Sequence, residues 1–240
     1  MQEKIKLENI LFLDIETVPG TSQFDELPEK MQSLWDKKSG FFRKDEELAE
    51  DVYSRAGIYA EFGKVICISI GMTYKKGQET HFRLKSFYGD NEKDLLMDFN
   101  LLLKKLSQKS ELQLCAHNGK EFDFPYLARR MLINGLELPA LLDVAGKKPW
   151  EVSFLDTMEL WKFGDYKHYT SLDLLTTIFQ IPTPKDDMDG SMVGDAYWKD
   201  NELEKIVKYC EKDVIAVVQL FLRYQGKPII PDEKIEITTF

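Results

Sequence analysis

The chain has 240 residues, of which 43% are hydrophobic and 12% aromatic, enough to bury the core of one domain, with or without a large insertion. No stretch approaches the ~18 to 20 apolar residues of a membrane span, and the N-terminus lacks the apolar core of a signal peptide, so we expect a cytoplasmic protein. The net charge of -9 argues against extended binding of a long nucleic-acid duplex, but it allows a short strand end held through metal ions and a few basic side chains.

The first predicted strand, within the stretch ILFLDIETVPG at residues 10–20, carries two acids. Side chains alternate between the faces of a strand, so Asp14 and Glu16 share one face with Ile10 and Phe12. If both faces are covered, the carboxylates leave water at a high cost unless a positive partner meets them, and a metal ion is the simplest such partner. The alternative is a strand that reaches the surface by residue 14 and leaves both acids solvated.

The next part of the chain predicts an insertion, a hairpin and a helix. Residues 21–63 are polar and dense in charge, and their partly helical spacing without a strand pattern indicates an inserted helical element. A continuous β-branched and apolar run at 64–74 leads through a glycine-containing turn into 79–89, which predicts a β-hairpin. Asn91 then caps a helix with one leucine-rich face.

The remaining elements complete an α/β pattern. They are a short buried strand at 112–117, a helix at 123–136, a further strand candidate at 152–157, a helix capped by Thr170 or Ser171, and a long helix at 201–224. This order predicts a mixed β-sheet flanked by helices, with an antiparallel meander followed by parallel strands and crossover helices. We expect one domain over residues 1–240, with its core at about 8–225. The tail at 226–240 adds an edge strand or contacts a partner.

The long helix carries an acid in its apolar stripe. Asp213 shares the spacing of a buried face with Cys210 and Val217, and a core-facing aspartate needs a partner. Tyr209 precedes Asp213 by four residues, so both side chains lie on the same side of the helix, one turn apart. The alternative is a helix that buries a tyrosine and lets one aspartate reach a hydrogen bond.

A further acid stands where the strand at 112–117 gives way to the next helix. In the stretch AHNGKEFDFPYL, Asp123 is a favoured N-cap residue, and Pro125 suits the first turn of a helix. The ends of buried strands in α/β sheets are also where ligands bind. The two roles are compatible, so the sequence leaves both open for Asp123.

These positions form a candidate set of four carboxylates: Asp14, Glu16, Asp123 and Asp213. If the fold gathers them, two Mg²⁺ or Mn²⁺ ions are the matching cofactors, because these hard cations prefer oxygen ligands. Two such ions ~3.5 to 4 Å apart activate a water and stabilise the leaving oxygen in phosphodiester cleavage. Histidine and cysteine ligands, which suit zinc, are absent from the set.

The same residues resemble the motifs of a known superfamily. FLDIETVP, HNGKEFDFPYL and YCEKDV are similar to the three motifs of the DEDD superfamily of 3′–5′ exonucleases, which has a ribonuclease H-like fold. Within it, the chain resembles a free-standing relative of the proofreading exonuclease domain of family-B DNA polymerases. The resemblance covers roughly Glu8 to Tyr224. The long insertion at 21–63 departs from compact relatives, and we expect it to form a wall of the substrate groove.

The resemblance implies a role for each matched residue. The four acids would hold the two metal ions, and Tyr209 would orient the attacking water, as in the tyrosine (DEDDy) subclass, because Lys208 stands where the sister subclass has histidine. Asn118 and Phe122 match positions that touch the terminal nucleotide, where an aromatic ring stacks on a base; for Phe122 the alternative is core packing.

The substrate implied by the resemblance is the 3′ end of single-stranded DNA. A ribonuclease that trims RNA ends is the nearest alternative, because the metal chemistry is indifferent to the sugar and discrimination depends on contacts to the 2′-hydroxyl. A non-catalytic nucleic-acid-binding module is an alternative of another class. Such a module would have lost one of the acids or Tyr209, and all are present.

Several other residues carry no clear functional signal. Arg129 and Arg130 are expected on solvated faces rather than against phosphates. Asp156 caps a helix or supports the site from outside, and the sequence leaves both open. The three cysteines lie singly in apolar stretches, which indicates buried thiols rather than disulfides: Cys67, Cys115 and Cys210.

Overall fold

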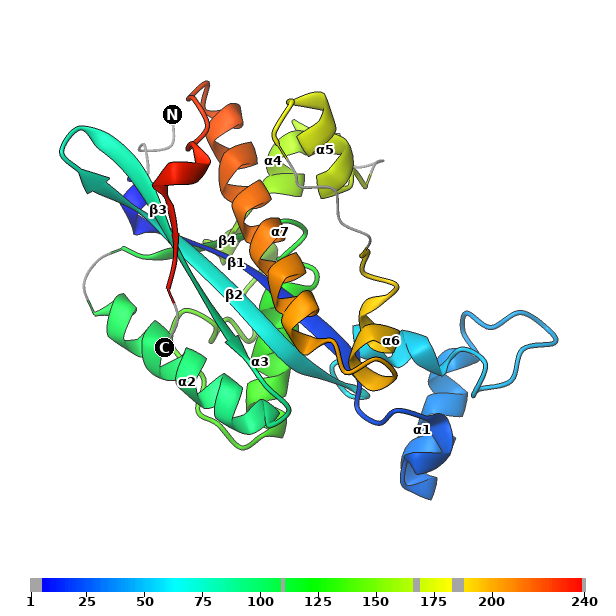
Figure 1. The fold of residues 1–240 in the computed structure, drawn as a ribbon. Helices are drawn as coiled ribbons and strands as arrows, with labels where there is room; N and C mark the ends of the chain where they lie inside the picture. The colour runs from blue at the N-terminus through cyan, green and yellow to red at the C-terminus, as the bar shows by residue number, and fades with distance from the viewer. Residues whose placement is uncertain (1–5, 109–110, 166–168, 183–187, 239–240) are drawn as a thin grey trace.

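The structure is a computed structural model that describes residues 6–108, 111–165, 169–182 and 188–238. A six-stranded sheet with the order β5-β4-β1-β2-β3-β6 lies at its centre (Figure 1). β1 pairs antiparallel with β2 and parallel with β4, so the sheet is mixed, as predicted. The strands are β1 (Ile10–Pro19), β2 (Gly63–Lys76), β3 (Glu79–Tyr88), β4 (Gln113–Ala116), β5 (Leu155–Asp156) and β6 (Ile235–Ile237).

Helices cover both faces of the sheet (Figure 1). They are α1 (Glu29–Ser39), α2 (Glu92–Ser107), α3 (Asp123–Ile133), α4 (Thr157–Lys162), α5 (Leu172–Ile178), α6 (Val193–Trp198) and α7 (Leu203–Tyr224). Leu11, Leu13 and Ile15 of β1 pack in one cluster with α2 and α3, whereas Ile10 and Phe12 pack with α7 on the other face. The alternation predicted for β1 is confirmed, and it directs Asp14 and Glu16 toward α7. None of the described helices is both long and apolar enough to cross a membrane.

Element boundaries differ from the predictions by a few residues. The long helix begins at Leu203 rather than at 201, and Ser171, not Thr170, caps α5 by accepting the Leu174 amide at 3.2 Å. The strand candidate at 152–157 is reduced to two residues, because the chain turns into α4 at once. The tail supplies β6, which pairs parallel with β3 and confirms the edge-strand alternative.

The insertion is helical and has a small core of its own. It contains α1 and two short 3-10 helices (Phe24–Glu26 and Tyr53–Ile58), and it projects from one side of the molecule (Figure 1). Trp35 of α1 is fully buried, and its indole Nε1–H donates to the Ala49 carbonyl at 2.8 Å. The insertion therefore packs around one tryptophan and leaves the sheet intact.

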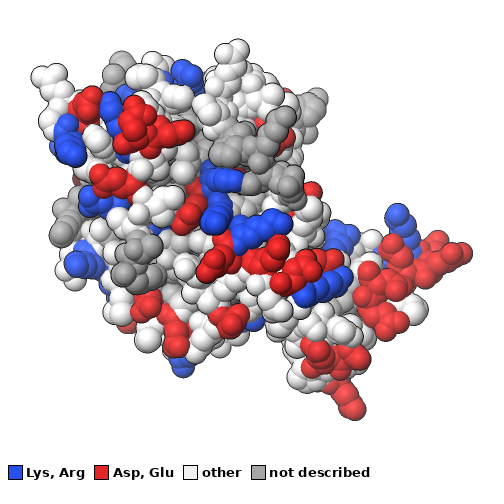
Figure 2. All heavy atoms as spheres, in the orientation of Figure 1, with Lys and Arg blue, Asp and Glu red and all other residues white. Residues whose placement is uncertain are grey.

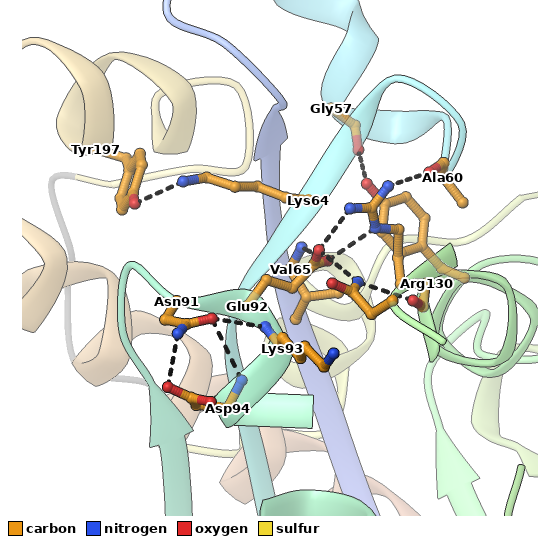
Figure 3. A network of polar contacts seen from close by, with 12 residues as sticks. Gly57, Ala60, Lys64, Val65, Asn91, Glu92, Lys93, Asp94, Arg130 and Tyr197 are labelled. Carbon is orange, nitrogen blue, oxygen red and sulfur yellow. Dashed lines mark hydrogen bonds and ion pairs between the residues drawn. The ribbon is translucent and has the colours of Figure 1, made fainter. Parts of the chain in front are cut away.

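A buried ion pair fixes the base of the insertion to the sheet and helices. The Arg130 guanidinium of α3 donates to Glu92 at the start of α2 through Nε at 2.8 Å, and to the Ala60 carbonyl at 2.8 Å (Figure 3). Glu92 also accepts the Val65 amide of β2 at 2.7 Å. The expectation of a solvated Arg130 is wrong, because a partner 38 residues away neutralises it in the interior.

We expect Arg130→Ala to destabilise the fold by about 3 to 5 kcal/mol, since it leaves the buried Glu92 carboxylate without its cation. Chemical denaturation with guanidinium measures the loss. Lys104→Ala, which breaks an exposed pair with Glu137, is the matched control and should cost at most about 1 kcal/mol. Equal losses for the two variants would contradict the role given to the buried pair.

Candidate active site

The acidic end of β1 lies between β2 and α7. Glu16 is buried, Asp14 is partly exposed, and Glu16 stands opposite Cys67 of β2. The register of the β1–β2 pair shifts between Glu16 and Thr17, so a bulge follows directly after the second acid. Bulges of this kind bend a strand and change the direction of its side chains. The register of the pairing is thus interrupted directly after the carboxylates, and the pairing then continues in a shifted register to Pro19.

α7 brings its own acid and a tyrosine to the same place. The Cys210 thiol donates to the Asp14 carboxylate at 3.3 Å and approaches the Asp14 carbonyl at 3.4 Å, which fixes the helix against β1. One helical turn separates Tyr209 from Asp213, and the Asp213 carboxylate lies close enough to the tyrosine hydroxyl to raise its pKa. Both side chains are partly buried. The predicted apolar stripe therefore faces β1 with Asp213 at its edge.

Asp123 reaches the site from a third element. It is the first residue of α3 and is 3% exposed, but its side chain does not cap the helix, whose N-cap position is Phe122. The N-cap role left open by the sequence is therefore not the one adopted. Instead, the Asp123 carboxylate lies close enough to the backbone of Ile15, the residue between Asp14 and Glu16, for that backbone to lower its pKa. The start of α3 therefore lies beside β1.

The carboxylates perturb one another's ionisation. Burial raises the pKa values of Asp14 and Glu16 well above the ordinary range, and the charges of Asp213 and Asp123 raise them further. Burial also raises the pKa of Asp123 to about 7, although backbone hydrogen bonds oppose the shift. The pKa of Tyr209 is raised by burial and by the same carboxylates, so its phenol stays protonated at neutral pH.

This donor set suits a hard divalent cation. Asp14, Glu16 and Cys210 each offer an atom within 4.8 Å of the others, and the carboxylates of Asp123 and Asp213 lie close enough to act on Asp14 electrostatically. Burial raises the pKa of the Cys210 thiol well above its ordinary value, so it remains a hydrogen-bond donor rather than a thiolate ligand. A bound cation would favour the ionised acids and offset the cost of burying them together.

The loop before α3 is held in a strained conformation. Asn118 has a positive φ of 62°, and its buried Oδ1 has no hydrogen-bond partner in the described part of the chain. The Asp156 carboxylate accepts the backbone amides of Asn118 at 3.0 Å and Lys120 at 3.1 Å. It also caps α4 by accepting the Met158 amide at 2.9 Å. Asp156 therefore fills both roles that the sequence left open.

A groove of about 970 Å³ runs from Glu16 between the insertion and α6. Phe122 lines it and is only partly buried, although its ring also packs against Tyr126. Figure 2 shows acidic side chains gathered over the insertion, which forms one wall. The charged residues of the lining are Glu16, Asp25, Glu50, Asp195, Arg55 and Lys199. Acids therefore outnumber bases along the groove.

The α6 wall of the groove is fixed by hydrogen bonds. The Tyr197 hydroxyl accepts from the Lys64 ammonium at 2.9 Å and donates to Asp90 at 2.7 Å (Figure 3 shows the first contact). The neighbouring Trp198 donates its indole N–H to the Pro19 carbonyl at the end of β1 at 3.1 Å. These contacts hold α6 against the strand that carries Asp14 and Glu16.

Cysteine was the residue type that sequence reasoning missed at this site. Cys67 and Cys210 were expected only as buried thiols, and all three cysteines are indeed free and buried. Cys210 precedes Asp213 by three residues, so helical spacing alone places it on the acidic face. Its contact with Asp14 was not visible in the sequence, because nothing local relates residue 14 to residue 210.

Comparison with protein families identifies the chain over most of its length. Residues 58–228 match the family described as a predicted 3′–5′ exonuclease related to the exonuclease domain of PolB. The matched region contains β2 to α7, including Asp123, Tyr209 and Asp213, whereas Asp14 and Glu16 precede it. The match covers more than half of the chain and agrees with the superfamily resemblance of its motifs. The chain belongs to this family of predicted 3′–5′ exonucleases.

Proposed function

We propose that the chain is a metal-dependent 3′–5′ exonuclease of the tyrosine subclass that acts on the 3′ end of single-stranded DNA. The observation that carries this proposal is the convergence of carboxylates from β1, α3 and α7 beside a protonated tyrosine. Buried acids that raise one another's pKa values are costly to a fold and are characteristic of functional sites. In this proposal, residues 1–240 form one exonuclease domain, and the insertion is a substrate-binding element.

Asp14, Glu16, Asp123 and Asp213 would hold two divalent ions, Mg²⁺ or Mn²⁺. When bound, such ions supply a nucleophilic water and stabilise charge on the leaving oxygen of a phosphodiester. The Tyr209 hydroxyl, one helical turn from Asp213, would orient that water. Because the pKa of Tyr209 is raised, the phenol acts through hydrogen bonds and not as a base.

Asn118 and Phe122 would receive the terminal nucleotide. The Phe122 ring lies at the groove beside Glu16, and Asn118 precedes it in the same loop. An aromatic ring stacks on any base, which suits removal of nucleotides without regard to sequence. The predominantly acidic lining of the groove favours a short single-stranded end over a duplex.

The direct test is digestion of 5′-labelled single-stranded DNA, the matching RNA and duplex DNA with Mg²⁺, Mn²⁺ or EDTA. We expect a ladder of shortened 5′-labelled products from single-stranded DNA that requires metal. A ladder only from RNA would establish the exoribonuclease alternative. Binding of either strand without any cleavage under all metal conditions would favour a non-catalytic module.

Bound metal should raise the free energy of unfolding, and this increase should be larger at neutral than at acidic pH. Asp123 holds its proton to about pH 7 in the folded protein but releases it near 3.8 when unfolded. The unfolded chain therefore binds fewer protons between these values, and the free energy of unfolding of the metal-free protein should fall as the pH rises through this window. Metal at ~100-fold excess over its Kd should add about 2.7 kcal/mol.

Thermal unfolding between pH 5 and 8, in EDTA and in millimolar Mn²⁺, measures both effects. Asp123→Asn is the matched control, because it keeps the shape of the side chain while removing its titration, and it should reduce the pH dependence in EDTA to the part contributed by Asp14 and Glu16. Identical melting temperatures with Mn²⁺ and EDTA at pH 8 would rule out the proposed metal site.

Substitutions of Asp213 and of Tyr209 should impair metal binding and turnover in different ways. Asp213→Asn removes a charged ligand, so metal affinity and turnover should both collapse. Tyr209→Phe keeps the ring and every carboxylate, so metal binding should persist while turnover falls by ~10² to 10⁴-fold, the usual contribution of a positioned proton-transfer or hydrogen-bonding group. Calorimetric Mn²⁺ titration and single-turnover digestion compare the two. Near-normal turnover by Tyr209→Phe would make the tyrosine a packing residue and remove the basis for its subclass.

A further inference from the structure

A second hollow, of about 500 Å³, lies beyond the opposite end of β1 from the acids. Its walls come from the segment before β1, the β2–β3 hairpin and the chain that follows α7, segments that meet at one end of the molecule (Figure 1). Four lysines and one glutamate line it: Lys6, Lys75, Lys227, Lys234 and Glu8. Positive charge is therefore concentrated here on a chain whose net charge is -9.

The hollow has a rigid frame. Gln219 of α7 is buried and clamps Ile230 of the wall through two hydrogen bonds, donating to its carbonyl at 2.6 Å and accepting its amide at 2.8 Å. Pro228 and Pro231 flank this clamp and restrict the backbone further. The segment after α7 is thus held in one conformation by the helix, and the wall that carries Lys227 is preorganised.

Two of the four ammonium groups have neither an ion pair nor a side-chain hydrogen bond in the described part of the chain. Lys234 pairs with Glu79 at 2.8 Å, and Lys75 donates to the Thr80 hydroxyl at 2.7 Å. Within the described ranges, Lys6 and Lys227 form neither an ion pair nor a side-chain hydrogen bond. Lysines held close together repel one another unless an anion lies between them. The hollow therefore offers two uncompensated charges to a ligand.

We propose that this lysine pocket binds phosphate groups. Ammonium groups bind phosphate as point charges, and a preorganised frame lowers the cost of gathering them around one. The bound phosphate belongs either to the backbone of a strand or to a free nucleotide. α7 joins the pocket to the acidic site, and Leu222, nine residues after Asp213, lies roughly 14 Å further along the helix axis. The strand alternative rests on the proposed nuclease function, whereas the free-nucleotide alternative does not.

The test compares Lys6→Gln/Lys227→Gln with Lys93→Gln/Lys105→Gln, which makes the same change in net charge at exposed positions of α2. Binding of a fluorescent (dT)20 strand is measured in EDTA over a range of salt concentrations. EDTA removes the metals on which nuclease activity depends, so the outcome is independent of cleavage. If the pocket holds backbone phosphates, the slope of log K against log salt should decrease by about 1.4 for the pocket variant and stay unchanged for the control, since each single-strand phosphate contact contributes ~0.7.

In a second experiment, inorganic phosphate or dTMP is titrated into each protein, and the NMR amide resonances of Thr80, Lys227 and Ile230 are followed. Saturable shifts in the wild-type protein and in the α2 control, lost in the pocket variant, would support the free-nucleotide source. Thermal unfolding of all three proteins verifies that the substitutions leave the fold intact. An unchanged salt slope together with no saturable shift at these amides would overturn the proposal.

Discussion

The packing of α7 across the acidic face of β1 is the constraint on which the candidate site depends. Ile10 and Phe12 bury themselves against Val214, Val217 and Phe221, so the helix is held close to the strand along its length. Because strand side chains alternate, the same packing carries Asp14 and Glu16 beneath the first half of α7. Hydrophobic burial thereby brings mutually repelling carboxylates together, and their raised pKa values reflect the free-energy cost of burying these charges.

Polar contacts determine how this costly arrangement is tolerated. The Cys210 thiol donates to Asp14, so this acid is partly satisfied without a cation. The Asp156 carboxylate supports the neighbouring loop by accepting the amides of Asn118 and Lys120. Such outer contacts hold the side chains of the candidate site in place.

Charge is distributed unevenly over the molecule in a way that suits metal-dependent binding. The groove beside Glu16 is lined mostly by acids, whereas lysines gather at the far end of α7. A strand end would therefore be attracted to the groove chiefly by bound cations rather than by the protein surface. The insertion, with its own core around Trp35, adds a wall to this groove without contributing a strand to the sheet.

The sequence predicted the structure well where the spacing of side chains along a single strand or helix determines which face they occupy. Alternation along β1 and helical spacing along α7 identified Asp14, Glu16 and Asp213 as acids on covered faces, and the mixed sheet followed from the order of elements. Contacts between distant segments were not accessible in this way. The Arg130–Glu92 pair and the lysine pocket are built from residues far apart in the chain, and Asp123 is the first residue of α3, beside the β1 backbone, instead of capping its helix.

The central claim is that the four carboxylates form one two-metal centre. A crystal of the protein soaked in Mn²⁺, with anomalous diffraction recorded at a wavelength where manganese scatters strongly, tests it most directly. The account predicts two anomalous peaks ~3.5 to 4 Å apart, each bound by oxygens of Asp14, Glu16, Asp123 or Asp213. Peaks confined to other surfaces, or no peak among these acids at saturating Mn²⁺, would contradict it.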